Sequence, residues 1–155
     1  MTHKQIEVLM DGQRLPAKAG ELVSAFFKRY PPQNQGKLLA AKINQNLVSL
    51  DAVLHANCRL TPVFYTDREG LAVYRRTACL ILYEAVEELY PEARVVVGQS
   101  LANGYYFDFV GDKPIDAEIL KNIETRMRQI VSENRPLAKE SLSIEEAKEY
   151  FEAEG

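Results

Sequence analysis

The residues best suited to bind a charged group are two adjacent arginines in the run Tyr74-Arg75-Arg76-Thr77. A guanidinium group presents a planar fork of N–H donors that matches a phosphate or a carboxylate. The surrounding sequence predicts a helix, on which consecutive side chains point to different sides. Only one of the two arginines can therefore face any one cleft.

A second set of polar groups lies in the aromatic run G-Y-Y-F-D-F, from Gly104 to Phe109. Asp108 could serve as a general acid, although pairing with an arginine is commoner for such a carboxylate. Tyr106 and the other tyrosines of this region could stack on bases, or they could pack with their hydroxyl groups at the rim of a core. We interpret Arg75, Arg76, Tyr106 and Asp108 as an anion- or ligand-binding cleft. Either it holds an anion, or Asp108 fills it by pairing with an arginine, and we favour the internal pair.

Histidine and cysteine are too sparse and too scattered to predict a metal centre. The chain has two histidines, His3 and His55, and neither C-x-x-C nor His-x-x-x-His occurs. Zinc sites need several convergent ligands, usually at such spacings. Cys58 and Cys79 stand alone, which is typical of buried thiols in a cytoplasmic protein rather than of a disulfide framework. We expect no metal site.

Other catalytic motifs are missing as well. The sequence has no G-x-S-x-G, and Gly36-Lys37 lacks the first glycine and the Ser or Thr of a phosphate-binding loop. We therefore expect no catalytic residue and no cofactor in this chain.

Composition and charge set broad limits on the class of protein. The chain has 155 residues, of which 46% are hydrophobic and 26% charged, as in a soluble globular protein of one or two small domains. No apolar run approaches the roughly 20 residues of a membrane span, so we expect no membrane partner. Residues 1–66 hold eight basic and four acidic side chains (net +4), and the remainder carries −7. The first half could meet a polyanion, but so modest a charge also fits an ordinary solvated surface.

The first half predicts a small sheet with one helix. The alternation of apolar and polar residues, with the turn signals between them, gives strands at 5–10, 13–16, 38–43, 47–48 and 58–65, and a helix at 22–30 that ends at Pro31-Pro32. This order fits a β-grasp fold. It resembles the TGS domain, through the Asp11-Gly12 turn, P-A-K-A-G-E before the helix, and N-Q-N-L-V-S-L-D at Asn44 to Asp51. We expect a TGS-like domain over residues 1–66.

The second half predicts a helix lying on a small antiparallel sheet. We expect a polar link at 66–70, a helix at 78–90 that is buried on most of its circumference, and strands at 94–98 and 105–109 joined by an Asn103-Gly104 turn. A helix at 115–134 with one apolar face follows, then a strand at 137–142 and a helix from Ile144 to about Ala153. Ser143 and Glu146 form the capping box of this last helix.

The motifs of the second half resemble the second additional domain of threonyl-tRNA synthetases, an editing domain also found in alanyl-tRNA editing proteins. The matching pieces are G-Y-Y-F-D-F and E-A-V at Glu84 to Val86. In that family the helix opens with His-x-x-x-His, and those positions fall on Arg76 and Leu80 here. Neither side chain can bind zinc or act as a base near neutral pH. The resemblance implies an α+β fold and lost editing over residues 67–155, in a domain that we expect to be shortened at its C-terminus.

The run Tyr74 to Thr77 also resembles the Y-R-R-[ST] of bacterial uridine (nucleoside) kinase-like proteins, which join TGS-like and degenerate editing-like domains to a P-loop kinase domain. This resemblance implies a non-catalytic accessory or regulatory region, with ATP and magnesium used by a C-terminal kinase domain of the same polypeptide. Binding of a nucleotide or RNA would then be weak. The alternative is a fragment of a threonyl-tRNA synthetase-related protein that binds tRNA without editing. A third interpretation is a stand-alone RNA-binding adaptor.

Overall fold

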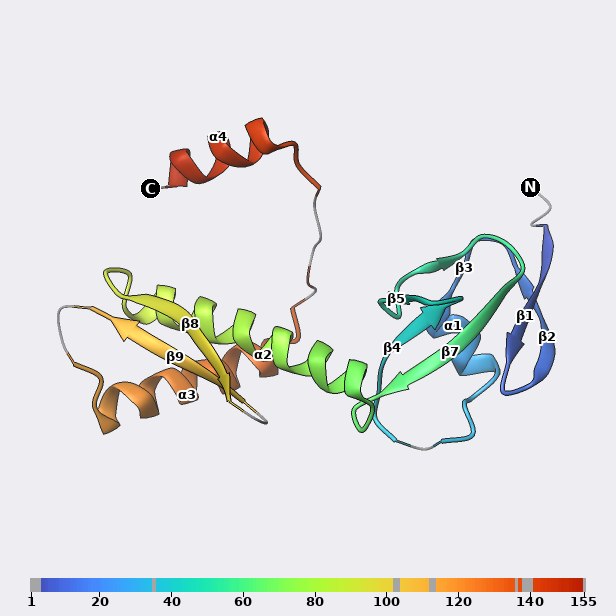
Figure 1. The fold of residues 1–155 in the computed structure, drawn as a ribbon, viewed down its shortest axis with the longest axis horizontal. Coiled ribbons are helices and arrows are strands. Elements are labelled where there is room, and N and C mark those ends of the chain that lie inside the picture. Colours follow the sequence, from blue (N-terminus) through green and yellow to red (C-terminus); the bar gives the residue numbers. More distant parts are fainter. Residues whose placement is uncertain are drawn as a thin grey trace.

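The computed structural model describes residues 4–34, 36–101, 104–111, 114–135, 137 and 141–154, and it shows an α+β protein arranged as two lobes and a separate terminal helix (Figure 1). The elements, in chain order, are β1 (Gln5–Met10), β2 (Gln13–Lys18), β3 (Glu21–Leu22), α1 (Val23–Arg29), β4 (Leu38–Ile43), β5 (Asn46–Val48), β6 (Val53–Leu54), β7 (Cys58–Phe64), α2 (Arg68–Leu89), β8 (Arg94–Leu101), β9 (Gly104–Val110), α3 (Ala117–Glu133) and α4 (Ile144–Glu154).

The first lobe is a five-stranded sheet in the order β2-β1-β7-β4-β5. Neighbouring strands are antiparallel except for the central pair β1–β7, which is parallel. The β1–β2 hairpin turns through Asp11 and Gly12, both with positive φ (48° and 78°), as a two-residue turn that matches the strand twist requires. The predicted strands and helix of this lobe are present, with ends shifted by one or two residues.

Helix α1 covers one face of the five-stranded sheet and closes the first core. Phe26 is fully buried there, and the fully buried Val8 of β1 belongs to the same cluster. Two short strands, β3 and β6, pair beside this core and were not predicted. At two residues each, they are too short to show an alternating pattern.

Helix α2 begins ten residues earlier than the sequence predicts, and this corrects the expected polar link. Gly70 lies inside the helix. Only glycine fits at this position, because a Cβ would lie 1.8 Å from the carbonyl oxygen of Phe64. A glycine that usually marks a loop thus marks a close contact between helix and strand. The link is reduced to the few residues between β7 and Arg68.

The second core lies between α2, α3 and the two-stranded sheet β8–β9. Ala85 and Val86 of α2 are buried there with Ile123 and Ile130 of α3. The expectation that α2 is buried on most of its circumference is wrong. Leu80 is 55% exposed, and besides Ala85 and Val86 the helix buries only Gly70. The predicted apolar face of α3 is confirmed at Ile119, Ile123, Met127 and Ile130, whereas Leu120 and Val131 are exposed.

The remaining predictions for the second half differ in outcome. Strands β8 and β9 pair as expected, but Asn103 of the predicted turn lies outside the described residues. Of the predicted strand at 137–142, the described positions 137, 141 and 142 are not in a strand. The capping box is confirmed: the Glu146 N–H donates to Ser143 Oγ (3.2 Å), and the Ser143 N–H donates to Glu146 Oε2 (2.8 Å). Helix α4 stands apart from both lobes (Figure 1).

Candidate functional site

The two arginines of the predicted cleft lie on the first half of α2. Arg75 is half-buried and Arg76 is exposed. Neither guanidinium forms an ion pair or a hydrogen bond with any residue that the structure describes. Such unpaired guanidinium groups can bind an anion without first losing an existing contact.

Tyr106 and Asp108 lie on the face of the β8–β9 sheet that points away from α2. Side chains alternate along a strand, and Phe109 packs into the core beside α2, so Tyr106 and Asp108 point to the opposite side. Both are exposed. The Tyr106 ring covers Gly98 on the neighbouring strand, where an added Cβ would lie 3.0 Å from its Cδ1. This contact gives Tyr106 a structural role in the hairpin.

The favoured internal pair between Asp108 and one of the two arginines is therefore not formed. Strand alternation places the carboxylate on the far face of the hairpin, while the guanidinium lies on the helix. The structure does not bring the four predicted residues into one cleft. The other alternative, an anion held by the arginines, stays a prediction.

A groove of about 320 Å³ lies between α2 and α3, and Leu80 lines it. Its charged groups are Arg135 and Glu84, joined by an ion pair of 2.7 Å from Nη1 to Oε1. Arg135 also contacts Glu133 through Nε, at 2.8 Å. The guanidinium group at this groove thus belongs to Arg135, for which the sequence predicts no role in a site. It is already paired.

A second ion-pair network joins the same two helices through Arg126 of α3. Its guanidinium donates to Glu88 of α2 and, at 2.8 Å, to Glu133 of α3. The hydrogen bond from Arg126 and its positive charge hold the pKa of Glu88 below its usual range. Both partners are ionised and paired near neutral pH, so this network holds the two helices together rather than offering an acid or a base.

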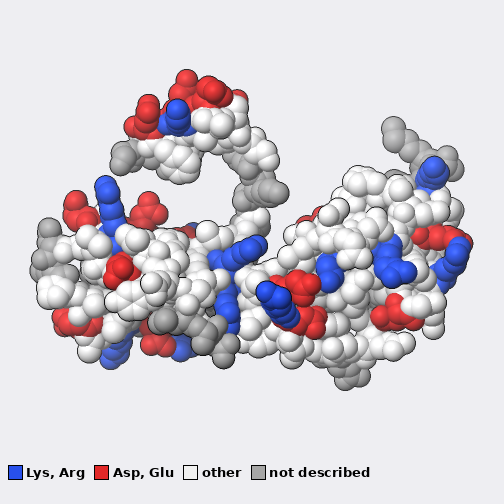
Figure 2. Space-filling view, in the orientation of Figure 1, with Lys and Arg blue, Asp and Glu red and all other residues white. Residues whose placement is uncertain are grey.

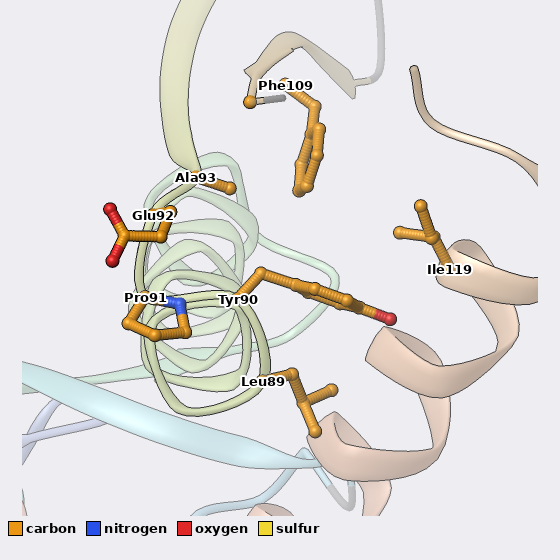
Figure 3. A pocket seen from close by; sticks show the side chains of 8 residues that line it. Leu89, Tyr90, Pro91, Glu92, Ala93, Phe109 and Ile119 are labelled. Carbon is orange, nitrogen blue, oxygen red and sulfur yellow. The ribbon is translucent and has the colours of Figure 1, made fainter. Parts of the chain in front are cut away.

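The apolar cavity at the C-terminal end of α2 has a volume of about 300 Å³ (Figure 3). Tyr90 crosses it and meets Phe109 edge to face, with ring centroids 6.1 Å apart. The Tyr90 hydroxyl accepts a long hydrogen bond, 3.5 Å, from Asn122 Nδ2. The Glu92 carboxylate points away from Tyr90 and Phe109 in this view. The cavity can take an apolar group, but it presents no reactive side chain.

Metal-binding chemistry is not assembled in the described part of the chain, where no three His, Cys, Asp or Glu side chains are grouped to hold an ion. His55 is exposed between β6 and β7, and His3 lies outside the described residues. Cys58 and Cys79 are half-buried free thiols, and burial raises the pKa of Cys58. No described helix combines the length and apolar character needed to cross a membrane.

Comparison with known proteins gives one consistent result. The chain is 35% identical over 147 residues to a threonine–tRNA ligase of Symbiobacterium thermophilum, which covers 95% of the chain and 23% of the ligase. It is 38% identical over 139 residues to that of Clostridium novyi (90% and 22%). It is 32% identical over 155 residues to the threonine–tRNA ligase of Desulfovibrio desulfuricans, a match that covers 97% of the chain and 24% of the ligase. The chain is related to threonyl-tRNA synthetases.

The extent of this similarity separates the interpretations drawn from the sequence. The chain spans roughly a quarter of the length of the threonyl-tRNA synthetases that it matches, and the match runs through both lobes. It supports the alternative of a synthetase-related fragment over the uridine kinase-like protein, for which no support is found. No family model matches the chain.

Proposed function

We propose that this chain is a non-catalytic portion of a threonyl-tRNA synthetase-related protein, that it binds tRNA in the cytoplasm, and that it does not hydrolyse mischarged tRNA. The observation that carries the proposal is the similarity to threonine–tRNA ligases over 90–97% of the chain. The sheet order β2-β1-β7-β4-β5 with one covering helix supports a TGS-like β-grasp domain at residues 1–66. Residues 67–155 form an editing-domain-like region in this proposal.

The loss of editing follows from the side chains at two positions. Arg76 and Leu80 occupy the places of the histidines in the resemblance, and neither can activate water near neutral pH. The described residues offer no replacement cluster of metal ligands. Binding, in contrast, needs only positive charge and shape, and residues 1–66 carry a net charge of +4.

Two assays on the whole chain test the proposal. Titration of a threonine tRNA transcript should show binding of micromolar order, weakening as salt rises, because phosphate contacts release counterions. Incubation with mischarged tRNA should release no more amino acid than buffer does. Absence of tRNA binding at low salt would remove the binding claim, and deacylation above background would remove the claim of lost editing.

A further inference from the structure

The strongest unassigned feature is the corner where β7 ends and α2 begins. Two exposed tyrosines meet there, Tyr65 after β7 and Tyr74 on α2, with ring centroids 5.1 Å apart at 88°. An edge-to-face pair leaves ring faces uncovered. The two rings are 41% and 47% exposed, so they form an aromatic platform at the surface rather than part of a core.

Three cations without an ion-pair partner among the described residues lie in the segments that carry this platform. Arg68 and Arg75 are seven residues apart on α2, so they share one side of the helix, which lies next to the side that carries Tyr74. The backbone of Lys37 lies beside Tyr65, because its carbonyl oxygen accepts a hydrogen bond from the Tyr65 N–H (2.8 Å). None of the three side chains pairs with an acidic group in the described part of the chain.

The corner is also rigid. Asp67 Oδ2 accepts a hydrogen bond from the Phe64 N–H (2.7 Å), and the Asp67 N–H donates back to the Phe64 carbonyl oxygen (3.0 Å). Lys42 of β4 pairs with Glu69 of α2 at 2.9 Å. With Gly70 pressed against Phe64, these contacts fix the helix on the sheet before any ligand arrives. A preorganised surface loses less entropy on binding.

Charge along the chain favours a polyanion at this corner. Residues 1–80 carry eleven basic and six acidic side chains (net +5), whereas residues 81–155 carry eight basic and sixteen acidic ones (net −8). In Figure 2, Lys and Arg side chains gather where the two lobes meet, with a smaller group of acidic side chains beside them, and acidic side chains predominate on α4. A polyanion is therefore attracted to the first lobe and the start of α2 and repelled by the end of the chain.

We propose that the Tyr65–Tyr74 platform, with Lys37, Arg68 and Arg75, binds a single-stranded RNA segment: one base stacks on the tyrosines, and the cations contact the flanking phosphates. Exposed aromatic rings beside unpaired cations are the usual means of holding single strands without sequence readout. The inference rests on the proposed tRNA binding and adds its location and the form of RNA that is bound.

The test compares variants of the whole chain by fluorescence anisotropy, with a labelled single-stranded RNA and its duplex as probes. The Arg68→Gln/Arg75→Gln double variant should bind the single strand about tenfold more weakly and lower the salt slope by roughly 1.4, the loss of two phosphate contacts. Tyr74→Leu should weaken binding roughly tenfold or more, whereas Tyr74→Phe should bind like the unmodified chain because it keeps the ring.

Arg94→Gln is the matched control, since Arg94 is an exposed arginine on β8, away from the corner. A loss that follows Arg94→Gln or Arg76→Gln instead of the corner variants would overturn the inference. So would a duplex bound as tightly as the single strand. If the unmodified chain binds no RNA, the proposed function itself fails; if it binds RNA and the corner variants bind normally, only this inference fails.

Discussion

At Gly70, a hydrogen atom in place of a methyl group lets α2 start directly against the end of β7. An added Cβ would lie 1.8 Å from the Phe64 carbonyl oxygen and 2.7 Å from its carbonyl carbon, both backbone atoms that cannot rotate away. The helix would have to shift off the sheet, which would strain the Lys42–Glu69 pair and the Asp67 hydrogen bonds. The junction therefore depends on this residue type.

Gly70→Ala should lower the free energy of unfolding by roughly 3 kcal/mol, because overpacking forces backbone movement. Gly36→Ala is the matched control, since its added Cβ would lie no closer than 3.4 Å to any neighbour. Urea unfolding of both variants gives the comparison. Equal stability of the two variants would show that helix and strand are not in close contact at Gly70.

Which side chains meet could be predicted from the sequence only in part. Their chemical types are evident in the sequence, as for Arg75 and Arg76, whose guanidinium groups suit an anion. The supposed partner, Asp108, is on the wrong face of its strand, because Phe109 enters the core and the strand alternates. The contact between Tyr65 and Tyr74 depends on the angle between a strand and a helix, which no local pattern encodes.

At the scale of elements, the cap of α4 makes its stability depend on pH. The hydrogen bonds from the Ser143 backbone and hydroxyl hold the pKa of Glu146 below its usual range. A carboxyl group with a lowered folded-state pKa contributes stability that is complete above its unfolded pKa, about 4.3, and lost as pH falls through the folded value.

NMR titration should accordingly give a Glu146 midpoint below the usual value, with helical shifts of α4 fading as the pH falls through it. In Ser143→Ala, which keeps the backbone donor and loses the hydroxyl, the midpoint should rise toward that value. A midpoint that is ordinary in the unmodified chain would mean that the capping box does not persist in solution.

The pairing of α2 with α3 gives a second test at this scale. Arg126 bridges the two helices and is 21% exposed, whereas Arg128 pairs only with Glu124 of its own helix and is 77% exposed. Arg126→Met should therefore lower the melting temperature clearly, and Arg128→Met should lower it little, since exposed pairs contribute little. Thermal melts followed by circular dichroism would measure both. A larger effect at Arg128 would contradict the bridging role.

Elements with strong local signals were predicted well, and those fixed by long-range contacts were not. The Asp11-Gly12 turn, the alternation of β1 and the apolar face of α3 carry their own patterns. The start of α2 was placed too late, because Gly70 reads locally as a breaker and only the contact with Phe64 explains it. The apolar run in α2 suggested burial on most sides, yet Leu80 is exposed beside the α2–α3 groove.

At the scale of the whole molecule, the α+β class and the succession of strands with one helix along the first half were predictable from turns and periodicity. The type of parent protein was not. The run Y-R-R-T favoured a kinase-like relative, whereas similarity along the full chain points to threonine–tRNA ligases. A four-residue motif holds far less information than sequence similarity that extends through both lobes.

The whole chain should also purify without stoichiometric zinc. Histidine and cysteine are too few and too dispersed to surround an ion, and Arg76 and Leu80 cannot serve as ligands. Elemental analysis of protein from a zinc-supplemented culture, before and after chelator treatment, would measure this. One zinc per chain that resists the chelator would contradict the prediction and the loss of editing inferred with it.

Helix α2 is shared by both lobes: Gly70 is pressed against the first sheet, and Val86 lies in the second core. Its 22 residues make a continuous rod of about 33 Å with no hinge at the boundary. Each residue of the helix turns the chain by about 100° and advances it by about 1.5 Å. Adding one residue in mid-helix would therefore rotate the β8–β9 hairpin by about 100° around the helix axis relative to the first sheet. The length of this helix can therefore change only by about whole turns if the two lobes are to keep the same relative orientation.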